Sequence, residues 1–268
     1  MIEIRNFSPR EYQKNILETC KGKNTLVCMP TGTGKTKTAV LLAVERLNKH
    51  AFSKVVICTP TKPLASQICR EFKECTNINP EEINLLTGHV APDQRAKIWE
   101  SSQIIVATPQ TIESDLKNKR ITLENVALLC IDECHRSKEN FANTTVAKIY
   151  NETAKNPRIL GLTASPGSSK EIIDLVYKNL FMEAVEIRTE EDDDIKEYIQ
   201  EKNMQYIKVD LPQEFVEISS LLMPVYRAKV GDLRKFGMFK PVSVVNKRDL
   251  LMMQRELLQD IRHGNPAA

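Results

Sequence analysis

The sequence predicts an α/β fold in which helices cover both faces of a parallel sheet. Three observations predict it: short apolar runs alternate with helical patterns, a polar motif follows most of these runs, and a glycine-rich loop joins the first run to a helix. Strands that are apolar throughout are buried on both faces, which is typical of parallel sheets. Because open α/β sheets bind ligands along the carboxyl edge of their strands, the motifs should gather there.

The first predicted helix spans residues 7–20. Ser8 has a typical N-cap side chain, Pro9 suits the first helical position, and Glu11 completes the start signal. Gln13 is a polar residue of this helix and lies shortly before the glycine-rich loop. Taken alone, Gln13 would be interpreted as a surface glutamine.

The remaining elements follow from the same alternation of patterns. The predicted strands are residues 26–29, 54–59, 82–87, 103–107, 126–131, 158–162 and 184–188. The predicted helices are residues 39–47, 64–72 and 92–99, one that ends near residue 116, and residues 141–154 and 170–180. Polar motifs that are far apart in the sequence should therefore meet in one crevice.

The glycine-rich loop has the chemistry of a phosphate cradle. Residues 29–36 read M-P-T-G-T-G-K-T. Glycines let the backbone approach phosphate oxygens, a helix N-terminus favours an anion, and the lysine and threonine can meet phosphate and Mg²⁺. Met29 stands where the strict pattern asks for glycine, but an ordinary glycine turn would not need the lysine and threonine that follow. The predicted nucleotide contacts are Thr31, Gly32, Thr33, Gly34, Lys35 and Thr36, with Thr36 also a magnesium ligand.

Two acids follow the predicted strand at residues 126–131. Asp132 can hold Mg²⁺, partly through water, and Glu133 can orient or deprotonate an attacking water. A turn that exposes two acids is the other interpretation, and the phosphate loop on the same sheet favours the catalytic one. His135 lies beside the pair, and we interpret it as a coupling residue. Thr163 and Ser165 could relay the γ-phosphate state or form a simple Ser/Thr turn, and the local sequence leaves both open.

Composition narrows the class of protein without identifying a partner. A hydrophobic content of 41% and a charged content of 27% are typical of a globular protein. No apolar run is long enough to span a bilayer, and the seven cysteines form no C-x-x-C pair. We expect reduced core cysteines in a cytoplasmic protein. A net charge of +3 neither requires nor excludes nucleic-acid binding.

The pattern changes after residue 188. Residues 190–194 are all acidic, which indicates a solvated linker or a helix start rather than a metal site. Residues 203–210 alternate like a strand, and two helical stretches follow at residues 215–233 and 247–261. The predicted organisation is an ATP-binding domain at residues 1–188, a linker and strand at 189–211, and a helical extension at 212–268.

The ordered motifs resemble superfamily 2 helicases of the D-E-x-H type, and most closely the group of archaeal Hef and the Fanconi anaemia M translocases. The resemblance covers most of the chain up to about residue 188. The matching motifs are M-P-T-G-T-G-K-T (29–36), T-P-T-K-P-L (59–64), T-G-H (87–89), A-T-P-Q-T (107–111), D-E-C-H (132–135) and L-T-A-S-P-G (162–167). It implies a RecA-like fold, ATP and Mg²⁺ as cofactors, and DNA, branched or forked, as partner.

The resemblance also implies residue roles. Gln13, with Arg10 nearby, matches the adenine-reading segment, Lys35, Asp132 and Glu133 match the catalytic positions, and Thr163 and Ser165 match the coupling segment. Loops that grip a nucleic-acid backbone through hydroxyls, N–H groups and one lysine need not read bases. The candidates in these loops are Pro60, Thr61, Lys62, Gly88, Thr108, Gln110 and Thr111.

Such helicases hydrolyse ATP between two RecA-like lobes, and the second lobe supplies arginine fingers. The sequence after residue 212 shows no second phosphate loop and instead resembles the start of the helical insertion between lobes. We therefore expect an N-terminal fragment of a longer protein, which binds ATP weakly and hydrolyses it poorly by itself.

Three other functions stay open. The RIG-I-like sensors and Dicer helicases share many of these motifs, so an RNA-duplex translocase is one alternative. An ATP-gated nucleic-acid binding module is the second. A small-molecule kinase is the third, and the T-P-T-K and A-T-P-Q-T loops argue against it.

Overall fold

The structure, a computed structural model, contains one seven-stranded sheet whose strands are all parallel. It describes residues 1–137, 141–164, 170–198, 206–237 and 239–262. The strand order is β3-β4-β2-β5-β6-β1-β7. The strands are β1 Thr25–Cys28, β2 Lys54–Cys58, β3 Ile83–Leu86, β4 Ile104–Ala107, β5 Val126–Asp132, β6 Ile159–Thr163 and β7 Ala184–Ile187.

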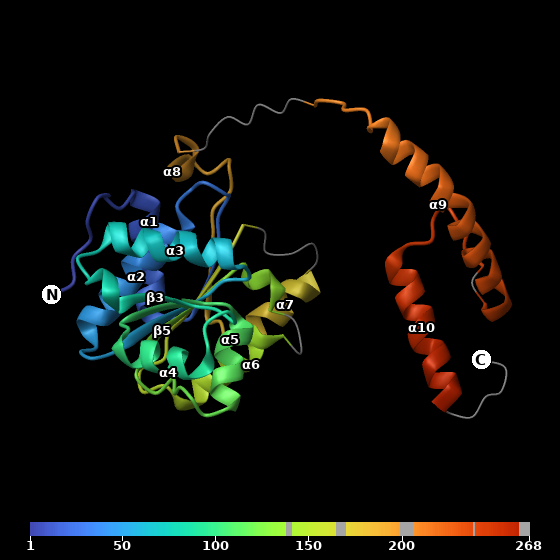
Figure 1. Cartoon of the computed structure of the whole chain (residues 1–268). Coiled ribbons are helices and arrows are strands. Elements are labelled where there is room, and N and C mark those ends of the chain that lie inside the picture. Colours follow the sequence, from blue (N-terminus) through green and yellow to red (C-terminus); the bar gives the residue numbers. More distant parts are fainter. Residues whose placement is uncertain (138–140, 165–169, 199–205, 238, 263–268) are drawn as a thin grey trace. The chain divides into compact units, whose positions relative to one another are not determined.

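Helices cover both faces of this sheet (Figure 1). One face is covered by α1 Glu11–Gly22, α2 Lys35–Lys49 and α3 Lys62–Cys75. The other is covered by α4 Pro92–Ser101, α5 Pro109–Lys117, α6 Ala142–Thr153 and α7 Lys170–Asn179. The chain runs from β1 toward β3 with helices on one face and returns toward β7 with helices on the other, as right-handed crossovers require. The prediction of a helix-covered parallel sheet is confirmed.

The core forms two apolar layers because successive strand residues point to opposite faces. In β2, Val55 and Ile57 join the layer under α1–α3, whereas Val56 and Cys58 join the layer under α4–α7. The seven cysteines are all buried and free, within these layers or beside them. This two-sided burial explains why the strands are apolar throughout instead of alternating.

The first helix begins later than predicted. Arg10 is extended, with ψ of 159°, and α1 starts at Glu11, so neither Ser8 nor Pro9 lies in the first turn. The Gln13 side chain accepts a hydrogen bond from the Arg10 N–H at 3.0 Å and thereby satisfies one of the groups that the helix start leaves without a backbone partner. The sequence signal for a proline start was therefore wrong by two residues, about half a turn.

Residues after β7 continue to pack against the sheet-bearing unit. The chain divides into two compact units, residues 1–201 and 202–268. Helix α8, Asp193–Lys196, starts within the acidic run and buries Ile195 completely in the core beside α1. The described part of the expected strand, residues 206–210, is not a strand. The proposed domain limits at residues 188 and 211 stay predictions.

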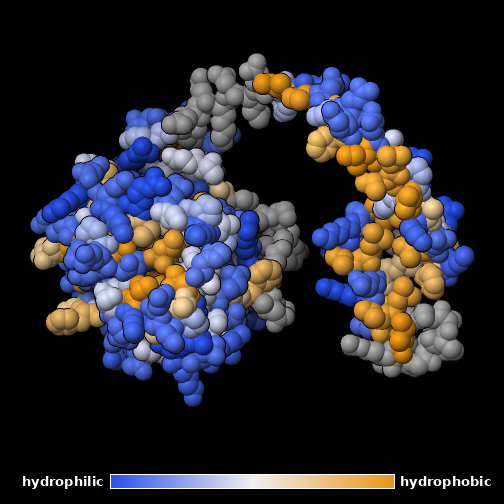
Figure 2. Space-filling view, in the orientation of Figure 1, coloured by the Kyte–Doolittle hydropathy of each residue, from blue (hydrophilic) through white to orange (hydrophobic). Residues whose placement is uncertain are grey.

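The second unit is helical and has a small core of its own. It contains α9 Gln213–Asp232, a short 3-10 helix at Leu233–Phe236, and α10 Lys247–Arg262. Its core is Val230, Val245 and Met253, with other apolar residues packed around them. Figure 2 shows apolar side chains on the surface of these helices. The exposed apolar residues include Phe215, Leu221 and Leu222. None of the described helices combines the length and the apolar composition that crossing a membrane requires.

Candidate nucleotide and nucleic-acid site

The carboxyl edge of the sheet contains a cleft of about 610 Å³. It lies where β1 runs into α2 and β5 ends, and the start of α1 closes one side. A cleft of this volume is in the size range of small-molecule and cofactor sites. Its lining brings together most of the predicted nucleotide residues, namely Arg10, Gln13, Thr31, Gly32, Gly34, Lys35, Thr36, Asp132 and Glu133.

Both loop glycines are required by their backbone conformation, and Gly34 is also required by lack of space. Gly32 and Gly34 have φ of +83° and +87°, a left-handed conformation that side chains disfavour. A Cβ on Gly34 would also lie 2.8 Å from Nε2 of Gln13, which donates a hydrogen bond to the Gly34 carbonyl at 3.3 Å. Met29, the departure from the strict pattern, is fully buried and donates its N–H to the Thr163 carbonyl at 3.1 Å. Met29 thus extends the sheet and leaves the glycine cradle intact.

Lys35 is the first residue of α2, where the helix N-terminus faces the cleft. Its ammonium group donates to the carbonyls of Met29 at 3.0 Å and Pro30 at 3.2 Å. Burial lowers the pKa of Lys35, and the neighbouring carboxylates of Glu133 and Asp132 act against that shift. The Lys35 ammonium group is therefore held inside the loop, where the phosphates of a bound nucleotide would also lie.

The two acids are placed at the mouth of the same cleft by the end of β5. Asp132 is half-buried and accepts a hydrogen bond from the Thr59 hydroxyl at 3.2 Å. Burial, followed by the charge of Glu133, raises the pKa of Asp132. Glu133 has φ of 51°, a left-handed conformation that is uncommon for a residue with a side chain and often marks a functional position.

Thr36 and Asp132 provide oxygen donors of the kind that Mg²⁺ prefers, and both line the cleft. Mg²⁺ commonly takes one or two protein oxygens and completes its shell with water and substrate phosphates. The donor set therefore fits the predicted magnesium site. Bound there, the ion would offset the charge of the phosphates, while Asp132 and Thr36 would hold it against the loop.

A short chain of polar contacts leads from Glu133 toward β6. His135 Nδ1 lies 3.3 Å from Glu133 Oε2 and 3.0 Å from the Thr163 hydroxyl. Thr163 is buried at the end of β6, and its carbonyl accepts from the N–H of Met29 in the phosphate loop. This arrangement suits the predicted coupling role of His135 and Thr163. Ser165, the third predicted coupling residue, lies outside the described residues.

The predicted adenine-reading segment is tied to the phosphate loop. Gln13 is 2% exposed, and besides contacting Gly34 it accepts from the Arg10 N–H. Tyr12 is fully buried, and its hydroxyl donates to the Thr33 carbonyl while accepting from Arg10. The start of α1 and the loop are therefore one hydrogen-bonded assembly.

The predicted nucleic-acid loops lie on the other half of the same edge, after β2, β3 and β4. Thr61, Lys62, Gly88 and Gln110 are exposed, and Pro60 and Thr108 are half-buried. Thr111 differs, because it is 6% exposed and its hydroxyl lies 2.8 Å from that of Thr108. Thr111 is thus placed to hold Thr108 rather than to meet a polymer itself.

Sequence reasoning missed the residues that join these loops. Arg95 of α4 and Asp115 of α5 form a buried bidentate ion pair, with both N–O distances 2.6 Å. Arg95 also donates to the Val90 carbonyl, just after the T-G-H motif, and Asp115 belongs to the helix that begins at A-T-P-Q-T. Thr59 was missed too, although it links β2 to Asp132. The sequence pattern does not show that Arg95, Asp115 and Thr59 are buried, because charged and hydroxyl side chains are usually exposed.

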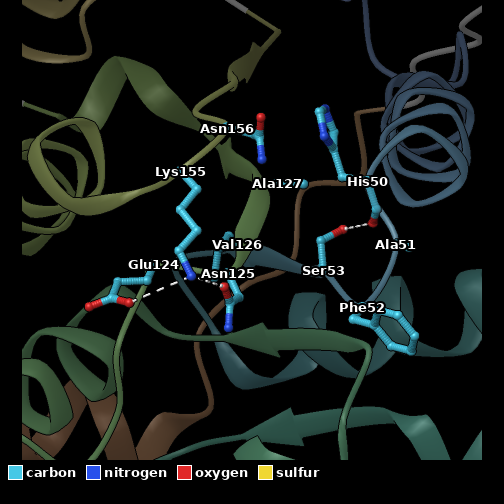
Figure 3. Close-up of a pocket in the computed structure, with 10 residues that line it drawn as sticks. All are labelled: His50, Ala51, Phe52, Ser53, Glu124, Asn125, Val126, Ala127, Lys155 and Asn156. Atoms are coloured by element: carbon cyan, nitrogen blue, oxygen red, sulfur yellow. Dashed lines mark hydrogen bonds and ion pairs between the residues drawn. The ribbon is translucent and has the colours of Figure 1, made fainter.

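A second, smaller pocket lies at the opposite edge of the sheet (Figure 3). Its volume is about 170 Å³, and its lining comes from the segments just before β2, β5 and β6. Figure 3 shows Lys155 directed at Glu124 and Asn125, with N–O distances of 3.9 Å and 3.0 Å. The pocket is too small for a nucleotide and has no glycine loop, so it does not compete with the cleft.

The fold and the cleft together define a RecA-like nucleoside-triphosphate-binding lobe. The comparisons with known proteins give the family: the DEAD/DEAH box helicase model matches residues 10–173, more than half of the chain. The chain belongs to this family.

Two curated relatives and one solved structure illustrate the match. An ATP-dependent DNA helicase of Schizosaccharomyces pombe is 37% identical over 245 residues, 91% of this chain and 29% of the relative. A DEAD-box ATP-dependent RNA helicase of Arabidopsis thaliana is 31% identical over 262 residues, 96% of this chain and 19% of the relative. The crystal structure of the Pyrococcus furiosus Hef helicase domain has a TM-score of 0.71 and 40% identity, covering 96% of this chain and 55% of that chain. The chain thus spans less than a third of the length of these two curated relatives.

Proposed function

We propose that this chain is the ATP-binding lobe of an ATP-driven DNA helicase or translocase that acts on branched or forked DNA. The observation that carries the proposal is the shared edge: the nucleotide cleft and the predicted backbone-gripping loops follow neighbouring strands. The Thr59–Asp132 hydrogen bond connects the two. The similarity to a DNA helicase of fission yeast and to the Hef helicase domain of Pyrococcus supports this class of activity.

In this mechanism the phosphate loop binds the triphosphate through its N–H groups and Lys35. Glu133 accepts a proton from the attacking water. The Nδ1 atom of His135 lies 3.0 Å from the Thr163 hydroxyl and 3.3 Å from Glu133 Oε2, so one nitrogen contacts both residues. A change at the γ-phosphate can then reach β6 through His135. Magnesium, held by Thr36 and Asp132, is the proposed cofactor, and base readout by Arg10 and Gln13 gives preference for adenine.

A second RecA-like lobe, which would supply arginine fingers, is part of the proposal. We therefore expect this 268-residue chain to bind ATP weakly and to hydrolyse it slowly. Brisk, DNA-stimulated turnover by the purified chain would contradict this expectation. The cytoplasmic location stays a prediction.

The alternative of an RNA-duplex translocase has a specific observation in its favour, since the Arabidopsis relative is named an RNA helicase. The test is ATP turnover, in the protein containing both lobes, with forked DNA, linear DNA duplex and RNA duplex at equal nucleotide concentration. The DNA proposal predicts strongest stimulation by forked DNA. Strongest stimulation by RNA duplex would transfer the function to the alternative.

A further inference from the structure

An aromatic side chain from outside the predicted motifs packs on the adenine-reading segment. The guanidinium carbon of Arg10 lies 4.0 Å from the centre of the Tyr198 ring. The same ring lies 5.8 Å from that of Tyr12, at an interplanar angle of 55°. Arg10 lines the nucleotide cleft, whereas Tyr198 is not among the described residues that line it. Tyr198 therefore contacts a residue of the cleft lining without itself being part of that lining.

Arg10 has two supports that fix its guanidinium. One is the Tyr12 hydroxyl, which accepts a hydrogen bond from Nη1 at 3.1 Å. The other is the face of Tyr198, a cation–π contact within the usual range of about 6 Å. A free arginine side chain loses considerable rotamer entropy when a ligand immobilises it. An arginine that is already held in place loses less, and so binds its ligand more tightly.

Tyr198 is itself anchored to the sheet-bearing unit. It follows α8, whose Ile195 is fully buried in the core layer that also contains Tyr12. Arg188 binds Asp194 at 2.9 Å, and the Asp192 carboxylate accepts from the Thr189 N–H at 2.6 Å, which fixes the turn before α8. Figure 1 shows α8 beside α1, the helix whose start carries Arg10. The segment after β7 thus places the Tyr198 ring against the Arg10 guanidinium group.

We propose that Tyr198 is a positioning residue for recognition of the nucleotide base, because its ring holds the Arg10 guanidinium at the mouth of the cleft for contact with the adenine. The inference rests on the proposed ATP site and adds a determinant that comes from outside the helicase motifs. Tyr198 acts only through Arg10. We therefore expect its influence at the base end of the nucleotide, while the loop at residues 31–36 binds the phosphates.

The test compares ligands with and without a base. Dissociation constants for ATP, ADP and inorganic tripolyphosphate are measured for the 268-residue chain and for Tyr198→Leu, Tyr198→Phe and Tyr206→Ala. Tyr198→Leu keeps apolar bulk against Tyr12 but removes the aromatic face, and Tyr206, which is 89% exposed, is the matched control. Thermal unfolding without ligand shows whether each variant is folded.

Tyr198→Leu should weaken ATP and ADP by the same factor, about threefold to tenfold, the range expected for loss of one cation–π contact. Its affinity for tripolyphosphate should stay unchanged, as should all affinities of Tyr198→Phe and Tyr206→Ala. In the Arg10→Ala background, Tyr198→Leu should have no further effect, because the two residues act as one unit. A purely structural role would instead weaken all three ligands together.

The inference is overturned if the chain binds ATP and Tyr198→Leu binds it equally well, or if tripolyphosphate weakens as much as ATP. If Tyr198→Leu does not fold, the decision rests on Tyr198→Phe and Arg10→Ala. The inference then requires that Tyr198→Phe keeps the affinity for ATP and ADP, and that Arg10→Ala loses it while still binding tripolyphosphate. If the unchanged chain binds neither ATP nor tripolyphosphate, the ATP site itself is wrong, and the proposed function fails together with the inference.

Discussion

The two halves of the carboxyl edge of the sheet are built differently. After β1, β5 and β6, the side chains of the predicted nucleotide site are held by hydrogen bonds and close polar contacts. Lys35 donates to loop carbonyls, and Asp132 accepts from Thr59. His135 contacts both Glu133 and Thr163. After β2, β3 and β4, most predicted nucleic-acid residues face solvent, among them Thr61, Lys62, Gly88 and Gln110. The buried Arg95–Asp115 pair connects the loops after β3 and β4 beneath the surface.

This difference matches the two tasks that we propose. Chemistry on a phosphate needs donors fixed before the reaction begins, since preorganised groups do not have to rearrange in the transition state. A motor that moves along any sequence needs backbone contacts that can be released and made again, which exposed hydroxyls, N–H groups and a single lysine supply. Changes in one half should therefore affect one activity first.

The largest effect is expected for Glu133→Gln. In the protein with both lobes, ATP turnover should fall by about 10²- to 10⁴-fold, because a general base contributes that much. ATP binding should remain, since the amide keeps the size of the carboxylate. Strand separation of forked DNA should be lost with turnover. If the variant still separates strands, the translocase assignment is wrong. The assignment is also wrong if partner capture is the only measurable activity and the variant captures its partner as well as the unchanged protein does, which is the result expected for an ATP-gated binding module.

Asp115→Asn should lower the free energy of unfolding by about 3–5 kcal/mol, because Arg95 would be left buried without its counter-charge. The side chains of Asp115 and Arg95 are 0% and 7% exposed, so solvent cannot replace the missing partner. Chemical denaturation measures the change, and Asp93→Asn, on the exposed first turn of α4, is the control. Equal stability of the two variants would show that the pair does not support the loops.

Lys35→Ala and Lys62→Ala form a crossed pair, with one lysine in each half. Lys35→Ala should weaken ATP at least tenfold, since hydrogen bonds to charged groups contribute about 1.5–3 kcal/mol, and should leave DNA binding measured without nucleotide unchanged. Lys62→Ala should weaken DNA binding and reduce the dependence of log affinity on log salt by about one unit, with ATP affinity unchanged. Titrations with labelled ATP and labelled DNA give both numbers. If Lys35→Ala weakened DNA binding and Lys62→Ala weakened ATP binding instead, the assignment of one half to nucleotide and the other to nucleic acid would be wrong.

The smallest effect concerns pH. The pKa of Asp132 is raised from its ordinary value of 3.8, mainly by burial and then by Glu133. A raised carboxyl pKa means that the charged form, which magnesium needs, is present above that pKa and is lost as pH falls through it. The magnesium-dependent part of ATP affinity should therefore decline at a higher pH than for a free aspartate. In the ligand-free chain the folded state binds more protons than the unfolded state between 3.8 and the raised pKa, so this group stabilises the fold as pH falls there.

A pH series of ATP titrations with and without magnesium measures this decline. Asp132→Asn should remove the pH dependence of the magnesium effect in that range. If the variant keeps the same pH dependence, another group is responsible.

Much of the nucleotide half could be predicted from the sequence because its chemistry is local. A tight loop needs Gly32 and Gly34, and the following lysine and threonine belong to the same turn, so one short stretch contains the whole signal. The fold followed from two-sided burial of the strands for the same reason. What could not be predicted depends on tertiary contacts: Thr59 reaches Asp132 across the sheet, and Tyr198 reaches Arg10 from the other end of the unit.

The errors have physical causes as well. The start of α1 was misplaced because Gln13, a residue inside the helix, caps it in place of Ser8. The acidic residues after β7 predict a linker, and the sequence gives no sign that Ile195 in this segment is buried in the core beside α1. Burial of Arg95 and Asp115 could not be predicted because each buried charge needs a partner of opposite charge that is distant in the sequence or on another turn, Asp115 for Arg95, and Arg95 with Arg120 for Asp115.

We propose that nucleotide bound in the cleft changes how the loops on the other half of the edge bind DNA. The hydrogen bond from Thr59 to Asp132 is one described contact between the two halves. The direct measurement is DNA affinity, in the protein with both lobes, with and without magnesium and a non-hydrolysable ATP analogue, for the unchanged protein and for Thr59→Val. The account predicts a change of at least about fivefold on adding the analogue, the lower end of typical coupling between sites, and a smaller change in Thr59→Val. Equal DNA affinity of the unchanged protein with and without a bound analogue would contradict it.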